Sequence, residues 1–231
     1  MMEKMRIAVG KTETTKYVGH LDFCRAVERA LRRAKLPVMY SVGFNPHMRL
    51  SFGPALSVGV ASAAEYVDVE LTEPVNETEF GRRLQAQLPP GLVFVAARLV
   101  SSNAALAAAL NLAEYEITGS TPTTPANLAA AESALAGFHA AEAVTYVRRT
   151  PKGEKTLEVK QYLAGPIGLA AKPAGLAVTF RLRMTAQGAV KPQEVLRLLQ
   201  DRFAFPVGAV ACRRIALWSE TPAGCRDPFE I

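Results

Sequence analysis

Residues 20–35 read HLDFCRAVERALRRAK and stand between a short apolar run at residues 6–10 and the proline at position 37. The apolar side chains in this stretch recur at helical spacing, which predicts a helix whose apolar stripe faces the core. Those side chains are Phe23, Val27, Ala30, Leu31 and Ala34. We expect the helix to end before Pro37, because the residue preceding a proline disfavours helical geometry.

The elements around this helix follow a readable order. Residues 65–71, EYVDVEL, alternate strictly and predict a half-buried antiparallel strand, with Val67, Val69 and Leu71 pointing inward and Tyr66, Asp68 and Glu70 outward. Further strands are expected at residues 6–10, 49–52 and 92–100, and a second helix at residues 77–87 with Asn76 as its N-cap. The resulting order, β-α-β-β-α-β, is typical of the ferredoxin-like split βαβ pattern.

The second half repeats this order with one extra strand. Its expected elements are a strand at 114–118, a helix at 125–139, a hairpin at 143–162, a strand at 175–185, a helix from Pro192 to residue 203 and a strand at 207–218. We therefore predict an α+β protein with two tandem ferredoxin-like (β-α-β-β-α-β) domains and antiparallel sheets. The domains are residues 1–101 and 114–231, joined by a linker at 102–113, and the second ends in an irregular tail.

Composition narrows the class of protein. The 231 residues carry a formal net charge of +6, which fits an anionic partner such as nucleic acid. Cys24, Cys212 and Cys225 are far apart and have no metal-ligand spacing, so we expect no metal site and no cofactor, and free thiols in a reducing cytoplasm. No signal peptide or apolar span is visible, so we expect no membrane partner.

Arginines line the polar side of the first helix. Arg25, Arg29 and Arg33 are four residues apart and share one face, and Arg32 lies beside Arg33. Their spacing of about 5.4 Å per turn could follow successive phosphates, which guanidinium groups bind in a fork-like geometry. The alternative is an ordinary solvated helix face, supported by Asp22 and Glu28.

The segment after this helix gathers polar groups in a turn. Gly43 permits unusual backbone angles and Asn45-Pro46 favours a turn, so the loop can offer backbone amides to an anion. The side chains that could add contacts to phosphate, sugar, base or a protein partner are Ser41, Asn45, His47 and Arg49. The alternative is a tight connection in which Asn45 hydrogen-bonds its own backbone.

Two histidines flank the basic helix and are the candidates for catalysis. His20 and His47 could supply general acid–base chemistry on RNA, one activating a 2′-hydroxyl and the other protonating the leaving oxygen. They should lie at opposite ends of the helix, roughly 20 Å apart by helical rise, which argues against a direct pair.

The second half carries its own basic residues. Arg149, Lys152 and Lys155 fall on the predicted hairpin, and Arg181 and Arg183 share an outward strand face with Thr179. Together they could form a platform for RNA, although Tyr146 and Tyr162 are the main aromatic side chains there for base stacking. The alternative is an ordinary set of exposed strand faces.

The motifs of residues 6–100 resemble a known family. The segments are GHLD at 19–22, RALRRA at 29–34, LP at 36–37, YSVGFNPH at 40–47, EY at 65–66 and LPPGL at 88–92, with a looser echo in KPQEVL at 191–196. They are similar to the radical-SAM-linked protein family, a domain of unknown function found beside or fused to a radical S-adenosylmethionine protein with a cobalamin-binding-type domain. Two positions depart from its pattern, since Gly19 replaces an expected Ser and Met48 an expected Pro. The resemblance implies an accessory chain whose radical SAM partner performs the chemistry, with RNA as substrate.

Three functions follow from these patterns. The first is a non-catalytic module that binds RNA or presents substrate to a radical SAM enzyme in RNA or ribosome modification. The second is a metal-independent RNA-processing endonuclease that uses His20 or His47. The third is a protein-interaction adaptor that docks the radical SAM partner through the same helix and does not bind RNA.

Overall fold

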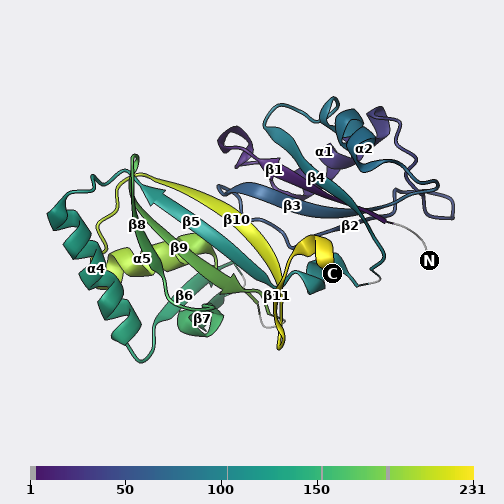
Figure 1. The fold of residues 1–231 in the computed structure, drawn as a ribbon. Coiled ribbons are helices and arrows are strands. Elements are labelled where there is room, and N and C mark those ends of the chain that lie inside the picture. The colour runs from purple at the N-terminus through teal and green to yellow at the C-terminus, as the bar shows by residue number, and fades with distance from the viewer. Residues whose placement is uncertain (1–3, 103, 152, 186–187) are drawn as a thin grey trace. The chain divides into compact units, whose positions relative to one another are not determined.

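The computed structural model describes residues 4–102, 104–151, 153–185 and 188–231. It is a mixed α/β structure with mostly antiparallel strands and divides into two compact units (Figure 1). The first unit comprises Met1–Asn111 and Arg214–Ile231, and the second comprises Leu112–Arg213. The last residues of the chain thus belong to the first unit, whereas the sequence patterns grouped them with the second.

The first unit contains the predicted order of strand, helix, strand, strand, helix and strand. These elements are β1 (Lys4–Lys11), α1 (His20–Arg33), β2 (Leu50–Phe52), β3 (Ala61–Glu70), α2 (Glu77–Gln85) and β4 (Leu92–Val100). The predicted N-cap of α2 is confirmed, since the Asn76 side chain accepts hydrogen bonds from the backbone amides of Thr78 and Glu79. The short helix α3 (Leu106–Ala109), which has no side-chain N-cap, lies in the segment predicted to be a linker.

The sheet of this unit has the strand order β4-β1-β3, with β2 also pairing with β3. All of these pairs are antiparallel. Helices α1 and α2 cover one face, where side chains from both helices and from β1 and β3 form a single apolar core. The predicted inward residues Val67 and Val69 belong to that core and are fully buried.

The opposite face of the sheet is less exposed than the alternating pattern predicts. Asp68 does lie on that face, but it is only 2% exposed, because the C-terminal 3-10 helix (Pro228–Glu230) packs there. Arg6, opposite Asp68 in the β1–β3 register, donates to both carboxylate oxygens at 2.6 and 2.9 Å and also to the backbone oxygen of Ile231. A buried ion pair therefore replaces the predicted solvated strand face.

The second unit combines a sheet, two helices and a separate hairpin. Its elements are β5 (Leu112–Gly119), α4 (Pro125–Ala140), β6 (Thr145–Thr150), β7 (Gly153–Glu158), β8 (Gly168–Lys172), β9 (Gly175–Arg183), α5 (Pro192–Phe203) and the start of β10 (Val210–Thr221). The sheet has the order β10-β5-β9-β8, while β6 and β7 pair only with each other. Strand β8 was not predicted, because its Gly- and Ala-rich sequence lacks the alternation of a strand.

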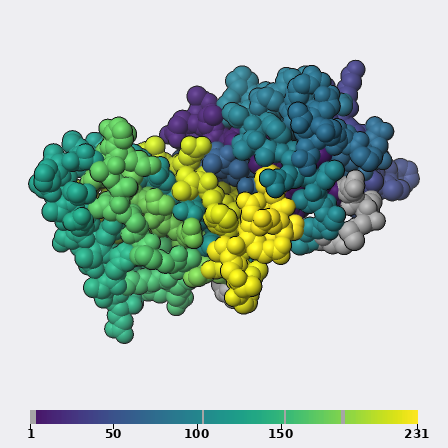
Figure 2. All heavy atoms as spheres, in the orientation of Figure 1, coloured from purple at the N-terminus to yellow at the C-terminus, as the bar shows by residue number. Residues whose placement is uncertain are grey.

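Helix ends in the second unit follow the sequence signals. Thr124 caps α4 by accepting a hydrogen bond from the amide of Asn127, and Pro192 opens α5 as predicted. The two helices meet through the rings of Phe138 and Phe203, whose centroids are 5.6 Å apart. Strand β10 then passes to the first unit, where β11 (Gly224–Arg226) and the C-terminal residues, yellow in Figure 2, complete the chain.

Candidate nucleic-acid interface

Helix α1 presents the predicted arginines to solvent. Arg25, Arg29, Arg32 and Arg33 are all exposed, and they fall within one arc of the helix because positions three and four apart share a face. The opposite arc is buried in the core of the first unit. The amphipathic pattern of residues 20–33 thus fixes which side of α1 faces solvent, and that side is strongly basic.

The four arginines differ in whether their charge is already engaged. Arg25 forms an exposed ion pair with Asp22 at 3.4 Å, and Arg33 donates to the backbone oxygen of Gln87. Among the described residues, Arg29 and Arg32 have no hydrogen-bond or ion-pair partner. Two guanidinium groups on the exposed face therefore remain available for a ligand.

The loop after α1 is closed by a clasp between Ser41 and His47. The amide of Ser41 donates to the His47 carbonyl at 2.8 Å, and the amide of His47 donates to Ser41 Oγ at 3.1 Å. Ser41 Oγ also lies 3.0 Å from His47 Nδ1. Two of the predicted contact residues thus hold the loop in shape, with Gly43 at a φ of +134° in the region that favours glycine.

The tip of this loop exposes two apolar side chains, Val42 and Phe44, completely. Asn45 is also exposed and lies beside them in the sequence. The contact residues predicted from the sequence were the polar residues of the loop, and Val42 and Phe44 were not among them. The sequence pattern that could have revealed them is a β-branched and an aromatic residue on either side of a turn glycine, a position where large apolar side chains are exposed.

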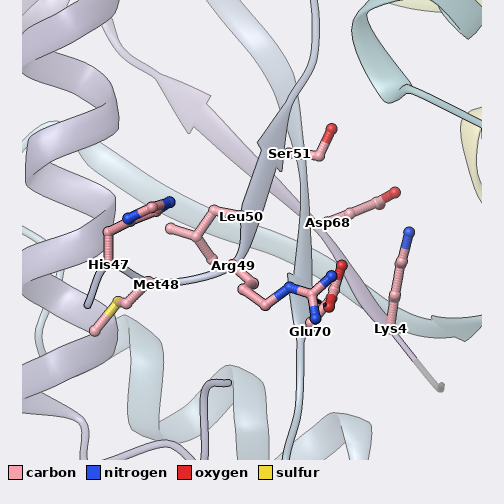
Figure 3. Close-up of a pocket in the computed structure, with 8 residues that line it drawn as sticks. All are labelled: Lys4, His47, Met48, Arg49, Leu50, Ser51, Asp68 and Glu70. Carbon is pink, nitrogen blue, oxygen red and sulfur yellow. Dashed lines mark ion pairs between the residues drawn. The ribbon is translucent and has the colours of Figure 1, made fainter. Parts of the chain in front are cut away.

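Arg49 is less available than the sequence predicts. Its Nε lies 2.9 Å from Glu70 Oε2, and its side chain extends toward Glu70 and away from His47 (Figure 3). A shallow cavity of about 220 Å³ lies here, lined in part by His47, Arg49, Asp68 and Glu70. Because Glu70 already holds the Arg49 guanidinium, a phosphate would have to break this ion pair to bind Arg49.

The two candidate histidines have different partners. His20, the first residue of α1, lies with Nε2 3.6 Å from Cys24 Sγ and packs edge-on against Phe52, whereas His47 pairs with Ser41. Burial lowers the pKa of His20, with opposing effects from Glu65 and from the cations Arg214 and Lys11. Burial also raises the pKa of Cys24 to about 11, which makes this thiol a poor nucleophile. No contact between described residues joins His20 to His47.

Most candidate cations of the second unit are engaged within the chain. Arg149 pairs with Glu154 across the β6–β7 hairpin at 2.9 Å, and Arg181 pairs with Glu114 at 3.0 Å. Arg183 donates to the Leu163 carbonyl at 3.0 Å. Lys155 is exposed on β7, and Lys152 lies outside the described residues.

The described parts of the chain contain no group of three or more His, Cys, Asp or Glu side chains that could hold a metal ion. No helix within them is both long and apolar enough to span a membrane.

Comparison with protein families gives one clear result. Residues 4–192 match the family described as "Uncharacterized protein conserved in bacteria (DUF2344)", so the chain belongs to that family. A search of curated proteins found no match. Among solved structures, a crystal structure of an unknown protein from Galdieria sulphuraria is 15% identical, with a TM-score of 0.24, over 91% of this chain and 95% of that one.

Proposed function

We propose that this chain is an accessory RNA-binding module that presents RNA to a radical SAM enzyme, in RNA or ribosome modification. The observation that carries the proposal is the pair of exposed arginines on α1, Arg29 and Arg32, which have no partner among the described residues. The radical SAM partner and a location in the cytoplasm rest on the family resemblance of residues 6–100 and on the free cysteines.

We also propose that the two units are tandem ferredoxin-like domains. The strand orders β4-β1-β3, with β2 beside β3, and β10-β5-β9-β8 support it, with the β6–β7 hairpin as an insertion. In such a domain the helices cover one face of the sheet, and α1 displays its polar side on the outside.

The loop tip favours single-stranded RNA over duplex. Phe44 is fully exposed, and unpaired bases stack on aromatic side chains whereas the bases of a duplex are already stacked. The Ser41–His47 clasp holds the tip before any ligand arrives, which reduces the entropy lost on binding. Arg29 and Arg32 would bind phosphates of the same strand.

The direct test measures binding of single-stranded RNA at several salt concentrations. We expect an affinity that falls with salt, because binding to phosphates releases counterions. The variant Arg29→Ala/Arg32→Ala should bind about 25-fold more weakly at low salt, and the slope of log affinity against log salt should fall by about two.

A matched control uses two arginines of the second unit that are ion-paired. Arg149→Ala/Arg181→Ala removes the same charge but leaves the slope nearly unchanged, because Glu154 and Glu114 already neutralise these groups. RNA binding without salt dependence, or equal losses in the two double variants, would contradict the proposal.

The exposed tip also supports a second function, the protein-interaction adaptor. Val42 and Phe44 could fill an apolar pocket of the radical SAM partner. Co-purification of that partner after nuclease treatment, lost in Val42→Ser/Phe44→Ser, would favour the adaptor. Loss of co-purification on nuclease treatment alone would favour the RNA-binding module.

A further inference from the structure

A bulge between β1 and β3 brings polar side chains together on the helix-covered face of the first unit. Val9 lies opposite Glu65 and Lys11 lies opposite Ser62, so two steps on β1 match three on β3. Without the bulge, Ser62 and Glu65 would point to opposite faces, but here both share the face of Val9 and Lys11. Val9 belongs to the core under α1 and α2, so these polar groups are enclosed on that side.

The enclosed group holds more positive than negative charge. Arg214 on β10 donates to both carboxylate oxygens of Glu65, from Nε at 3.1 Å and from its terminal nitrogen, and also to the Pro54 carbonyl. Lys11 is only 3% exposed and donates to the Val18 carbonyl at 2.8 Å, with no carboxylate partner among the described residues. Glu65 is therefore matched by Arg214, and the Lys11 ammonium is left as an unneutralised buried charge.

The start of α1 adds backbone amides beside Lys11, and the acidic residue of its first turn, Asp22, is paired with Arg25. The N-cap residue Gly19 has no side chain to accept the first backbone amides of the helix. His20 begins α1 two residues after Val18, whose carbonyl accepts from the Lys11 ammonium, so its ring lies at the same end of the helix as Lys11. Burial is the main cause of the lowered pKa of His20, with further effects from Glu65, Arg214 and Lys11. Burial lowers the pKa of Lys11 as well, which reflects the cost of its unneutralised charge.

A hydroxyl without a partner completes the group. Ser62 is 2% exposed, and its Oγ has no hydrogen bond among the described residues. A buried donor without a partner costs free energy that a ligand oxygen would recover. The half-buried ring of His20, in edge-to-face contact with that of Phe52, is the accessible part of the cluster.

We propose that Lys11, Ser62 and His20, at the N-terminus of α1, form a binding site for one anionic group, a phosphate or a carboxylate. A bound oxygen would accept from the Lys11 ammonium, the Ser62 hydroxyl and the uncapped amides of α1, and would neutralise the excess charge. This site needs none of the α1 arginines, so it stands apart from the RNA-binding proposal.

The test titrates inorganic phosphate into the full chain at constant ionic strength and follows the histidine side chains by NMR. The chain has three histidines, and His20→Gln assigns the His20 signal. We expect a saturable shift of the His20 signal alone, with His47 and His139 as internal controls. No saturable shift of His20, or equal shifts of all three signals, would overturn the proposal.

Two variants test the named donors. Lys11→Met should raise the half-saturating phosphate concentration about tenfold or more, and Ser62→Ala about threefold, because each removes one donor. Lys172→Met, which removes a lysine paired with Glu116 in the second unit, should leave it unchanged. Ser62→Ala carries the test by itself if Lys11→Met does not fold, and unchanged phosphate binding in every folded variant would overturn the proposal.

Different anions identify the source of the group. Tighter binding of phosphate than of acetate would assign a phosphate ligand, and the reverse a carboxylate ligand. A 5′-phosphorylated oligonucleotide that shifts His20 more strongly than its 5′-hydroxyl form would assign the phosphate to a nucleic-acid end. Equal shifts with phosphate, acetate and chloride would overturn the proposal, because they would report general ionic effects.

Discussion

The basic face of α1 and the basic strands of the second unit look alike in sequence but differ in how their charges are used. In the second unit, Arg149 and Arg181 pair with carboxylates and Arg183 with a carbonyl. On α1, Arg29 and Arg32 are exposed and have no partner among the described residues. Counting basic residues therefore overestimates how strongly the basic strands of the second unit can bind phosphate, because a paired guanidinium must break an existing interaction before it binds a phosphate.

The largest effect should come from Arg148, a partly enclosed and ion-paired arginine of the second unit. Arg148 donates to both carboxylate oxygens of Glu194 and to the Ala189 carbonyl, tying the β6–β7 hairpin to the start of α5. Arg148→Met leaves Glu194, 8% exposed in its side chain, without its cation and should lower the free energy of unfolding by about 2–3 kcal/mol. Urea unfolding measures this loss.

A control separates this structural role of Arg148 from ligand binding. The affinity of folded Arg148→Met for single-stranded RNA should match that of the unaltered chain, because the charge of Arg148 is already paired with Glu194. An RNA affinity reduced as strongly as in Arg29→Ala/Arg32→Ala, with no loss of stability, would remove the contrast between the two surfaces.

The next effect tests the aromatic side chains of the two units. Phe44→Ala should weaken binding of single-stranded RNA by about 1–3 kcal/mol, which is roughly 5- to 150-fold, and leave duplex binding and stability unchanged, since Phe44 is fully exposed. Tyr162, a stacking candidate of the second half, is 8% exposed and cannot stack on a base. Fluorescence anisotropy with matched single-stranded and duplex RNA provides the measurement.

Tyr146→Ala in the second unit is the control for Phe44→Ala. Tyr146 lies partly buried on β6, so its replacement should change RNA affinity less than that of Phe44. A larger loss in Tyr146→Ala would place the stacking surface on the hairpin instead. If the unaltered chain binds anionic lipid vesicles and Phe44→Ala does not, the loop tip is a membrane contact instead.

The sequence predicted the helices better than it predicted which charged side chains are buried or paired. Helical spacing and capping signals located α1, α2, α4 and α5 because both depend on neighbours in the chain. By contrast, Asp68 was expected at an outward position, and only the distant C-terminal segment explains its burial beside Arg6.

The candidate site was predicted in the same uneven way. The exposed arginines of α1 follow from helical periodicity, whereas the pairings of Arg49 with Glu70 and of Arg181 with Glu114 depend on strand neighbours that spacing cannot reveal. Of the cluster around Lys11, only His20 was singled out from the sequence, and in a different role. The cluster depends on a bulge that changes the face of Ser62 relative to Glu65, and nothing in the local sequence marks it.

A smaller effect concerns the pH dependence of stability in the first unit. Burial lowers the pKa of His20 in the folded state below its unfolded value of about 6.5, so the unfolded chain binds more protons between the two values. The contribution of His20 to stability is fully present above the unfolded pKa and is lost as the pH falls through that range. His20→Gln should therefore flatten the decline of the free energy of unfolding below about pH 6.5, measured by urea unfolding. An unchanged or steeper decline would contradict the burial of this imidazole.

The smallest effect is also the most direct comparison of the two surfaces, made with single substitutions of exposed arginines. Arg29→Ala should weaken RNA binding about fivefold at low salt, which is the loss of one phosphate contact worth about 1 kcal/mol. Arg149→Ala should change it less than about twofold, because Glu154 at 2.9 Å already holds that guanidinium and the pair is nearly neutral at a distance. Adding Glu154→Gln to the chain removes the competitor, so Arg149 should then gain influence and its replacement in that background should cost more. If Arg149→Ala costs the same with and without Glu154, pairing does not decide which arginines bind RNA, and the difference between the surfaces must come from the shape of α1 and its loop.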